Sequence, residues 1–101
     1  MRIVICGAGE VGSHAAEVLD KDQANSTTVI DKDADRLSSI EEWLDGATLE
    51  GNCVQADILL EAGIATADAI VAATDCDEVN LLKSLALLEI FTPYPLLVII
   101  F

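Results

Sequence analysis

The chain has 101 residues, 52% of them apolar, and its 18 acidic residues against 5 basic ones give a formal net charge of −13. This apolar content is too high for a disordered chain, and the length predicts a single domain, residues 1–101, with one core. The basic residues are scattered along the sequence. This argues against nucleic acid as a partner, because phosphate backbones are bound by clustered lysine and arginine.

No membrane-spanning segment is expected. The most apolar part of the chain, residues 81–101, contains Lys83, Glu89 and two prolines, and its longest charge-free stretch is the twelve residues 90–101. A spanning helix needs about 20 apolar residues. We therefore expect this segment to form a helix and a strand of a globular domain.

Short apolar runs alternate along the chain with segments of helical period. Strands are predicted over residues 2–6, 27–31, 47–50, 68–74 and 96–101, and helices over 11–21, 33–45, 56–62 and 77–91. Asp33 and Asp77 are expected to cap the second and fourth helices, and Gly46 to end the second. Leu37, Ile40, Trp43 and Leu44 would form the apolar face of the second helix. The alternating order predicts an α/β protein with a doubly wound, Rossmann-like parallel sheet covered by helices on both faces.

A glycine-rich turn follows the first predicted strand and opens the first helix. Gly7-Ala8-Gly9-Glu10-Val11-Gly12 has the spacing G-x-G-x-x-G. In such a loop the first glycine permits the tight turn, the second lets a diphosphate approach the backbone, and the third allows close packing of helix on sheet. The helix N-terminus adds free amides and the positive end of its dipole. We therefore expect residues 7–12 to bind the diphosphate of a dinucleotide.

An acidic residue stands where the ribose of such a dinucleotide would lie. Asp31 closes the second strand, 19 residues after Gly12. Its carboxylate can accept both ribose hydroxyls, and it would repel a 2′-phosphate, so NAD(H) is favoured over NADP(H). Glu10 beside the diphosphate makes ATP and ADP the less favoured ligands, since only Lys32 and Arg36 lie nearby as cations. The alternative is a glycine turn without a ligand and a solvated Asp31.

Polar residues also follow the third and fourth predicted strands. Asn52 can hydrogen-bond an adenine edge, and Thr74 and Asp75 are placed to touch the ribose or the nicotinamide half. A plain turn explains each of these residues singly as well. Asp77 and Glu78 are expected mainly to complement the N-terminus of the last helix, with a divalent ion held there as the weaker alternative. No catalytic residue and no metal site is predicted.

The three cysteines are read as reduced thiols of a cytoplasmic protein. Cys6, Cys53 and Cys76 are separated by 47 and 23 residues, and no CxxC pair occurs. These spacings favour neither a disulfide framework nor a zinc site. Cys53 and Cys76 fall close to the predicted site, where two roles remain open: small apolar fillers, which the pattern favours, and redox sensing.

The last predicted helix is apolar around most of its circumference. Between residues 78 and 91 it has only five polar side chains, Glu78, Asn80, Lys83, Ser84 and Glu89. A helix of this kind is buried on more than one side. One side would cover the sheet, and the other is expected to meet a second copy or a further domain.

Four ordered blocks carry a resemblance to a known family. The sequence resembles the TrkA-N (RCK) nucleotide-binding domain of potassium uptake and conductance regulators over about residues 1–91, in the blocks MRIVICGAGEVG, VIDKD followed by Arg36-Leu37, GNCVQADILLEAGI and ADAIVAATDCDEVN. The resemblance implies a non-enzymatic regulatory domain that binds NAD(H), ATP or ADP and controls a membrane potassium transporter or channel. It also implies a homo-oligomer, dimeric or larger, that is cytoplasmic and peripheral to the inner face of the plasma membrane.

Site residues follow from the same resemblance, position by position. They are Gly7, Ala8, Gly9, Glu10, Val11, Gly12, Asp31, Lys32, Asn52, Cys53, Thr74, Asp75 and Glu78. Glutamate at position 10, where ATP-binding members often carry arginine, resembles the dinucleotide-binding branch. After Phe91 the chain departs from the family, which usually continues with a basic strand, a helix and a sixth strand. We therefore expect a domain truncated after its fifth strand.

Two enzymatic functions are alternatives to the regulatory function. The chain could be the cofactor-binding half of an NAD-dependent dehydrogenase, because fold alone does not determine function. Methyl transfer from S-adenosylmethionine also uses a glycine loop and an acid after the second strand, although Gly12 favours a dinucleotide. A single histidine and the absence of an activated serine or cysteine favour the non-enzymatic interpretation.

Overall fold

The computed structural model describes residues 1–73, 76–88 and 97–100. Its strands are β1 (Arg2–Cys6), β2 (Ser26–Asp31), β3 (Ala47–Glu50), β4 (Ala69–Ala72) and β5 (Leu97–Ile100). Its helices are α1 (Glu10–Asp20), α2 (Ala34–Glu41), α3 (Ala56–Glu61), the short 3-10 helix η1 (Ile64–Thr66) and α4 (Glu78–Leu88). The predicted alternation of strands and helices is confirmed; η1 was not predicted.

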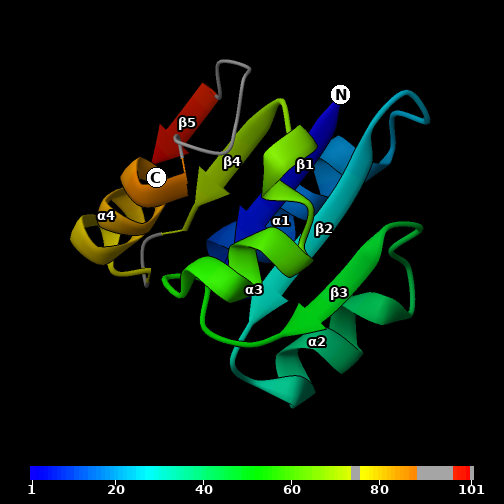
Figure 1. Ribbon diagram of the computed structural model, residues 1–101. Coiled ribbons are helices and arrows are strands. Elements are labelled where there is room, and N and C mark those ends of the chain that lie inside the picture. The colour runs from blue at the N-terminus through cyan, green and yellow to red at the C-terminus, as the bar shows by residue number, and fades with distance from the viewer. Residues whose placement is uncertain (74–75, 89–96, 101) are drawn as a thin grey trace.

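The five strands form one parallel sheet in the order β3-β2-β1-β4-β5 (Figure 1). The chain builds outward from β1 to β3, then returns to the other side of β1 for β4 and β5. This reversal is the topological switch point of a doubly wound sheet, and ligands of such sheets bind outside the carboxyl ends of the strands there. The predicted fold class is confirmed.

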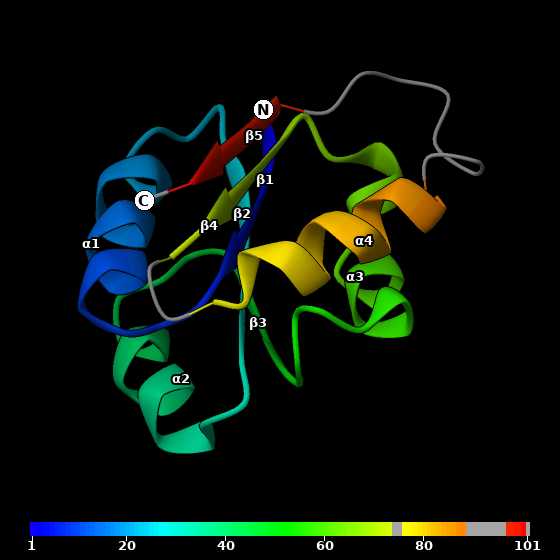
Figure 2. The same ribbon diagram turned by 90° about the vertical axis from the view of Figure 1, so that its left-hand side faces the viewer.

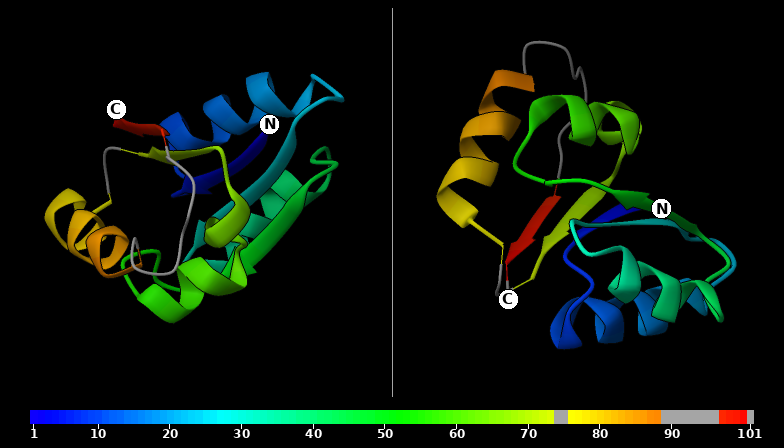
Figure 3. Two further views of the ribbon diagram at one scale, coloured as in Figure 1. Left: turned by 45° about the horizontal axis from the view of Figure 1, so that its top comes forward. Right: turned by 90° about the horizontal axis from the view of Figure 1, so that it is seen from below.

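Helices cover both faces of the sheet. α1 and α2 pack on one face and α3 and α4 on the other (Figures 2 and 3). The strands are buried on both sides, so alternate residues enter opposite layers: Ile5 and Val29 join the α1/α2 layer, and Val4 and Ile30 the α3/α4 layer. This two-sided burial explains why the central strands are continuous apolar runs rather than alternating ones.

Two aspartates begin helices as predicted. The Asp33 carboxylate accepts a hydrogen bond from the Asp35 amide (2.9 Å) at the start of α2. The Asp77 carboxylate accepts one from the Asn80 amide (3.2 Å) at the start of α4. Each side chain satisfies an amide of the first helical turn that has no intrahelical acceptor. Residues 89–91, the predicted end of the last helix, lie outside the described residues.

The predicted end of the second helix is wrong. α2 ends at Glu41, not at residue 45, and Gly46 directly precedes β3 instead of closing the helix. The cause is a tertiary contact: the Asp20 carboxylate at the end of α1 accepts from the Asp45 amide (2.9 Å) and from the Thr27 hydroxyl (2.9 Å). The Asp45 amide is therefore bonded to α1 and not to a preceding helical carbonyl.

Trp43 is consequently not part of the apolar face. Leu37 and Ile40 are buried under the sheet, whereas Trp43 lies beyond the end of α2 and is 42% exposed. It lines a surface pocket with Glu17 of α1 and Lys21, the residue that follows α1. The helical period that placed it inward does not extend to its position.

The two sides of α4 differ in burial. Leu81, Leu85 and Leu88 are buried against α3 and the sheet, and the hydroxyl of the buried Ser84 donates to the Val54 carbonyl. The opposite side carries exposed apolar residues, Val79, Leu82 and Leu87. Within the described ranges, no helix has the length and apolarity required to cross a membrane.

Candidate functional site

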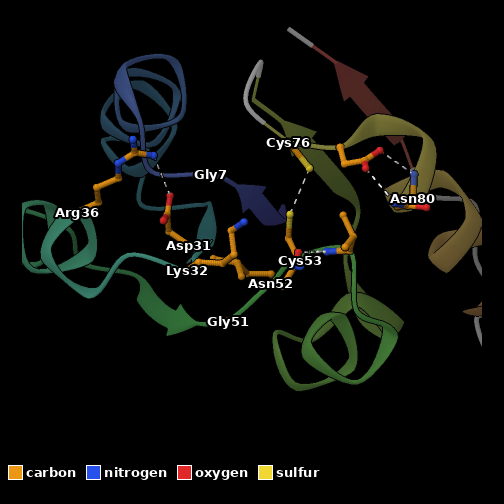
Figure 4. A pocket seen from close by; sticks show the side chains of 12 residues that line it. Gly7, Asp31, Lys32, Arg36, Gly51, Asn52, Cys53, Cys76 and Asn80 are labelled. Carbon is orange, nitrogen blue, oxygen red and sulfur yellow. Dashed lines mark hydrogen bonds and ion pairs between the residues drawn. The ribbon is translucent and has the colours of Figure 1, made fainter.

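A pocket of about 420 Å³ opens at the carboxyl edge of the sheet (Figure 4). Its walls come from the loop after β1, the β2–α2 turn, the β3–α3 loop and the start of α4. The lining residues are Gly7, Ile30, Asp31, Lys32, Arg36, Gly51, Asn52, Cys53, Val54, Cys76, Asp77 and Asn80. The pocket thus occupies the position at which the topology predicts a ligand site.

The glycine loop forms a tight turn between β1 and α1. Gly7 has φ of +106°, a conformation that favours glycine, and its amide donates to the Ile30 carbonyl (2.8 Å). Gly12 is buried in the first turn of α1, where a Cβ would lie 1.8 Å from the Gly7 carbonyl oxygen. Gly9 is the N-cap and has no side chain to cap the helix. The first-turn amides of α1 therefore remain available to an anion.

Asp31 is the most firmly held acid of the site. Its Oδ2 accepts from the buried Ala8 amide (2.7 Å) and lies 3.7 Å from Arg36 Nη1, and its Oδ1 accepts from the Asp33 amide (2.7 Å). Asp31 is only 9% exposed. These contacts fix the carboxylate beside the glycine loop, and its two oxygens retain lone pairs for further donors.

Two of the five basic residues of the chain line this pocket. Lys32 follows Asp31 directly, and Arg36 stands one turn into α2, where its guanidinium also lies 3.9 Å from Asp33. In a chain of net charge −13, this local pair lowers the cost of bringing an anion to the pocket.

Two asparagines line the pocket, Asn52 in the β3–α3 loop and Asn80 at the start of α4. Asn52 Oδ1 accepts from the Val54 amide (3.1 Å), which shapes the β3–α3 turn and leaves the side-chain NH2 group as a donor toward a ligand. Asn80 Nδ2 donates to the Asp77 carboxylate (2.9 Å) in the first turn of α4. These amides give the acidic site neutral hydrogen-bonding groups.

The structure brings together some of the predicted site residues and not others. Gly7, Asp31, Lys32, Asn52 and Cys53 line the pocket. Ala8, Gly9 and Gly12 form the adjoining turn without lining it, and Glu78 is exposed at the start of α4. Glu10 and Val11 line a separate apolar groove between α1 and β5. Thr74 and Asp75 lie outside the described residues.

The predicted site residues leave out seven that line the pocket: Ile30, Arg36, Gly51, Val54, Cys76, Asp77 and Asn80. Arg36 and Cys76 were expected only to lie near the site and Asp77 to cap the last helix, whereas Ile30 and Val54 are apolar and carry no chemical signal of their own. Asn80 was detectable in principle, because the first turn of a helix that follows a strand end faces the ligand crevice of this topology.

Two of the three cysteines, Cys53 and Cys76, line the pocket. Cys53 Sγ lies 3.2 Å from Cys76 Sγ, as Figure 4 shows, and both side chains are half-buried. Contacts with these two thiols, together with burial, raise the pKa of the fully buried Cys6 far above its usual range. A hydrogen bond with Cys6 lowers the pKa of Cys53, but Cys76 and burial outweigh it and raise that pKa to about 12. Across the described ranges, no group of three or more His, Cys, Asp or Glu side chains is arranged to hold a metal ion.

The parallel doubly wound sheet, the glycine turn and the acid at the end of β2 define a Rossmann-type α/β domain. Comparison with known proteins gives the family. The model of the TrkA-N domain matches residues 3–100, and the chain belongs to this family.

Curated relatives share a substantial part of the sequence. A Trk system potassium uptake protein TrkA homolog of Archaeoglobus fulgidus is 44% identical over 86 residues, and TrkA of Halomonas elongata is 43% identical over 82. These matches cover 85% and 81% of this chain, but only 19% and 18% of the relatives. The chain therefore spans about a fifth of their length.

Solved structures share the fold. The Kef CTD of Shewanella denitrificans in AMP-bound form has a TM-score of 0.73 at 20% identity, covering 99% of this chain and 58% of that one. Apo saccharopine dehydrogenase from Saccharomyces cerevisiae has a TM-score of 0.70 at 14% identity, covering 96% of this chain and 21% of that one. At such identities the likeness concerns the fold alone.

Proposed function

We propose that this domain binds NAD(H) in the pocket at the carboxyl edge of the sheet and acts as a non-enzymatic regulator of a membrane potassium transporter. The observation that carries the proposal is the fixed Asp31 carboxylate beside the open N-terminus of α1. The potassium partner rests on the names of the relatives, which are potassium uptake proteins.

The diphosphate of the nucleotide is assigned to the turn at residues 7–12. Gly9 presents backbone there without a side chain, and the unpaired first-turn amides and the dipole of α1 favour an anion. Lys32 and Arg36 add positive charge on the same side of the pocket. Glu10 lines the separate groove between α1 and β5, so the diphosphate is assigned mainly to backbone amides.

The adenosine ribose is assigned to Asp31. The Ala8 and Asp33 amides hold the carboxylate in place, so it can accept from ribose hydroxyls without first being ordered. A 2′-phosphate at this place would meet a buried negative charge, which favours NAD(H) over NADP(H). Asn52 and Cys53 are assigned to the adenine side, and Thr74, Asp75 and Glu78 to the remaining part of the ligand.

Other adenine nucleotides are the second candidate ligand class. AMP is bound by the Kef domain that shares this fold, and an adenosine with one phosphate would use the same carboxylate and the same helix N-terminus. A triphosphate would bring more negative charge to a strongly acidic chain. We therefore place ATP and ADP after NAD(H).

The exposed side of α4 supports a homo-oligomer. Val79, Leu82 and Leu87 form an apolar strip that a second copy of the domain would cover, giving a homodimer or a larger assembly. Such an assembly would work in the cytoplasm at the inner face of the membrane, and NAD(H) would act by binding one of its arrangements more tightly than another.

Titration calorimetry with NADH, NADPH, ATP and AMP tests the ligand assignment. We expect NADH to bind most tightly. In Asp31→Asn, NADH should lose about tenfold to hundredfold in affinity, since a hydrogen bond to a charged group contributes about 1.5–3 kcal/mol. The affinity for NADPH should fall less, because the substitution also removes the repulsion between the Asp31 carboxylate and the 2′-phosphate.

Asp35→Ala is the matched control. Asp35 stands in the same helix–turn segment and carries the same charge, but it is exposed and does not line the pocket. We expect its NADH affinity to stay within about twofold of the wild type. Tighter binding of ATP than of NADH, or an unchanged NADH affinity in Asp31→Asn, would overturn the assignment.

A further inference from the structure

Three segments far apart in the chain each place a cysteine near the carboxyl edge of the sheet, and two of these cysteines, Cys53 and Cys76, line the pocket. Cys6 ends β1, Cys53 lies in the turn between β3 and α3, and Cys76 lies in the bend before α4. The carboxyl ends of parallel strands meet at one edge of the sheet, and there the sulfur atoms of Cys53 and Cys76 are 3.2 Å apart (Figure 4).

We propose that Cys53 and Cys76 are an oxidisable thiol pair that a hydroperoxide converts into a reversible disulfide across the nucleotide pocket. The sulfur of Cys53 loses its proton and attacks one peroxide oxygen, forming a sulfenic acid and releasing one water. The sulfur of Cys76 then attacks that of Cys53, its proton leaves with the hydroxyl group as a second water, and the S–S bond forms. In sum, two thiols and one hydrogen peroxide give one disulfide and two waters.

The geometry permits this bond with a small movement. A disulfide needs about 2.0 Å between the sulfur atoms, so the pair must close by about 1.2 Å. Both cysteines lie in irregular backbone, in the turn after β3 and in the bend before α4, and neither belongs to a strand or helix. Shifts of this size in such segments do not require any strand to move.

Cys53 and Cys76 differ from Cys6 in their access to solvent. Cys53 and Cys76 are half-buried and line the pocket, so a small peroxide reaches them through its opening. Cys6 has no exposed surface and belongs to the core under α3 and α4. Oxidation is therefore expected to join the two pocket cysteines and to leave Cys6 as a thiol.

The short distance between the two sulfur atoms also determines what happens to the sulfenic acid of Cys53. Cys53 is largely protonated at neutral pH, because its pKa is raised to about 12, so attack on peroxide is slow. Once a sulfenic acid forms, however, the second sulfur already lies beside it. Capture within the molecule then competes well against a second peroxide, which would give a sulfinic acid.

The bond would join two walls of the pocket. Cys53 follows Asn52 on the β3 side, and Cys76 precedes the Asp77–Asn80 turn of α4, so their closure draws these walls together over the ends of β2 and β1. This consequence rests on the proposed function: we expect the oxidised domain to bind NADH at least about fivefold more weakly. Bound NADH should in turn slow the oxidation.

The first test follows the bond itself and needs no nucleotide. The full chain is treated with hydrogen peroxide, and the product is analysed by intact mass and by peptide mapping without reduction. Wild type and Cys6→Ala are expected to lose two hydrogen atoms and to yield a Cys53–Cys76 linked peptide, which dithiothreitol separates. Cys53→Ser and Cys76→Ser should not form it. A bond that involves Cys6, a bond between two chains, or a sulfinic acid without any disulfide would overturn the proposal.

The second test measures NADH affinity of the reduced and the oxidised wild type. Weaker binding after oxidation, restored by dithiothreitol and absent in Cys76→Ser, supports the coupling to the pocket, and an equal affinity in both forms overturns it. If the disulfide forms but neither form binds any nucleotide, the proposed function fails while the thiol pair stands. If reduced protein binds NADH but no disulfide forms, only the thiol pair fails.

Discussion

Gly12→Val is expected to destabilise the protein by at least about 3 kcal/mol, because a side chain at this position has no space. Any Cβ at position 12 would lie 1.8 Å from the Gly7 carbonyl oxygen and 2.7 Å from its carbon. These atoms are backbone, in a turn that is also tied to β2 by the Gly7 amide. Relief would require α1 to move off the sheet, which exceeds the usual cost of overpacking. Thermal unfolding followed by circular dichroism should show a midpoint lower by about 15 °C, or no cooperative transition.

Gly9→Ala separates this steric effect from nucleotide binding. Gly9 has φ of −70° and ψ of −165°, a conformation that alanine adopts without strain. We expect a midpoint close to that of the wild type but weaker NADH binding, since the methyl group would stand where the diphosphate approaches the backbone. A wild-type midpoint for Gly12→Val would contradict the packing argument. Undiminished NADH affinity in Gly9→Ala would remove the diphosphate from this turn.

Leu59→Ala is expected to cost about 2–5 kcal/mol of the free energy of unfolding. Leu59 is fully buried in α3, where it packs against the sheet and α4 in the layer that contains Ile30, Ile70 and Leu81. In a domain of this size that face is covered mainly by α3 and α4, and the truncation leaves a cavity under them. Urea unfolding followed by fluorescence of Trp43 or by circular dichroism measures the loss.

The adjacent leucine is the control for this truncation. Leu60 is 46% exposed on the same helix, so Leu60→Ala removes the same atoms at the same helix propensity but from a half-solvated position. We expect a loss below about 1 kcal/mol. Equal losses for the two variants would mean that α3 packs on the sheet through a different face.

Local patterns were sufficient for most elements. The continuous apolar run of β1, the glycine turn and the helix after it depend on neighbouring residues only, and Asp33 and Asp77 cap helices through contacts two or three residues away. The helical period predicted the wrong end for α2, where a residue distant in the sequence forms a hydrogen bond. The Asp20 carboxylate takes the Asp45 amide, so α2 ends early and Trp43 is left exposed, although its spacing from Ile40 is helical.

In the candidate site, too, some features were predictable from the sequence and others were not. Gly7, Asp31, Lys32 and Asn52 were predictable because each follows a strand, and parallel strands end at one edge. The contact of Asp31 with the Ala8 amide was not predictable, because it depends on how the loop after β1 folds back over β2. Asn80 was detectable in principle from the topology, although its exact place depends on how α4 packs against α3.

Residue order and spacing alone therefore establish a doubly wound parallel sheet, its glycine turn and the acid at the end of β2, since these follow from hydrophobic period and from the conformations that glycine allows. Tertiary packing decided which distant side chains meet. The 22 residues between Cys53 and Cys76 include α3, η1 and β4, and no local rule indicates that the chain returns one sulfur to within 3.2 Å of the other. That distance is set by the crossover that places β4 beside β1, on the opposite side from β2 and β3.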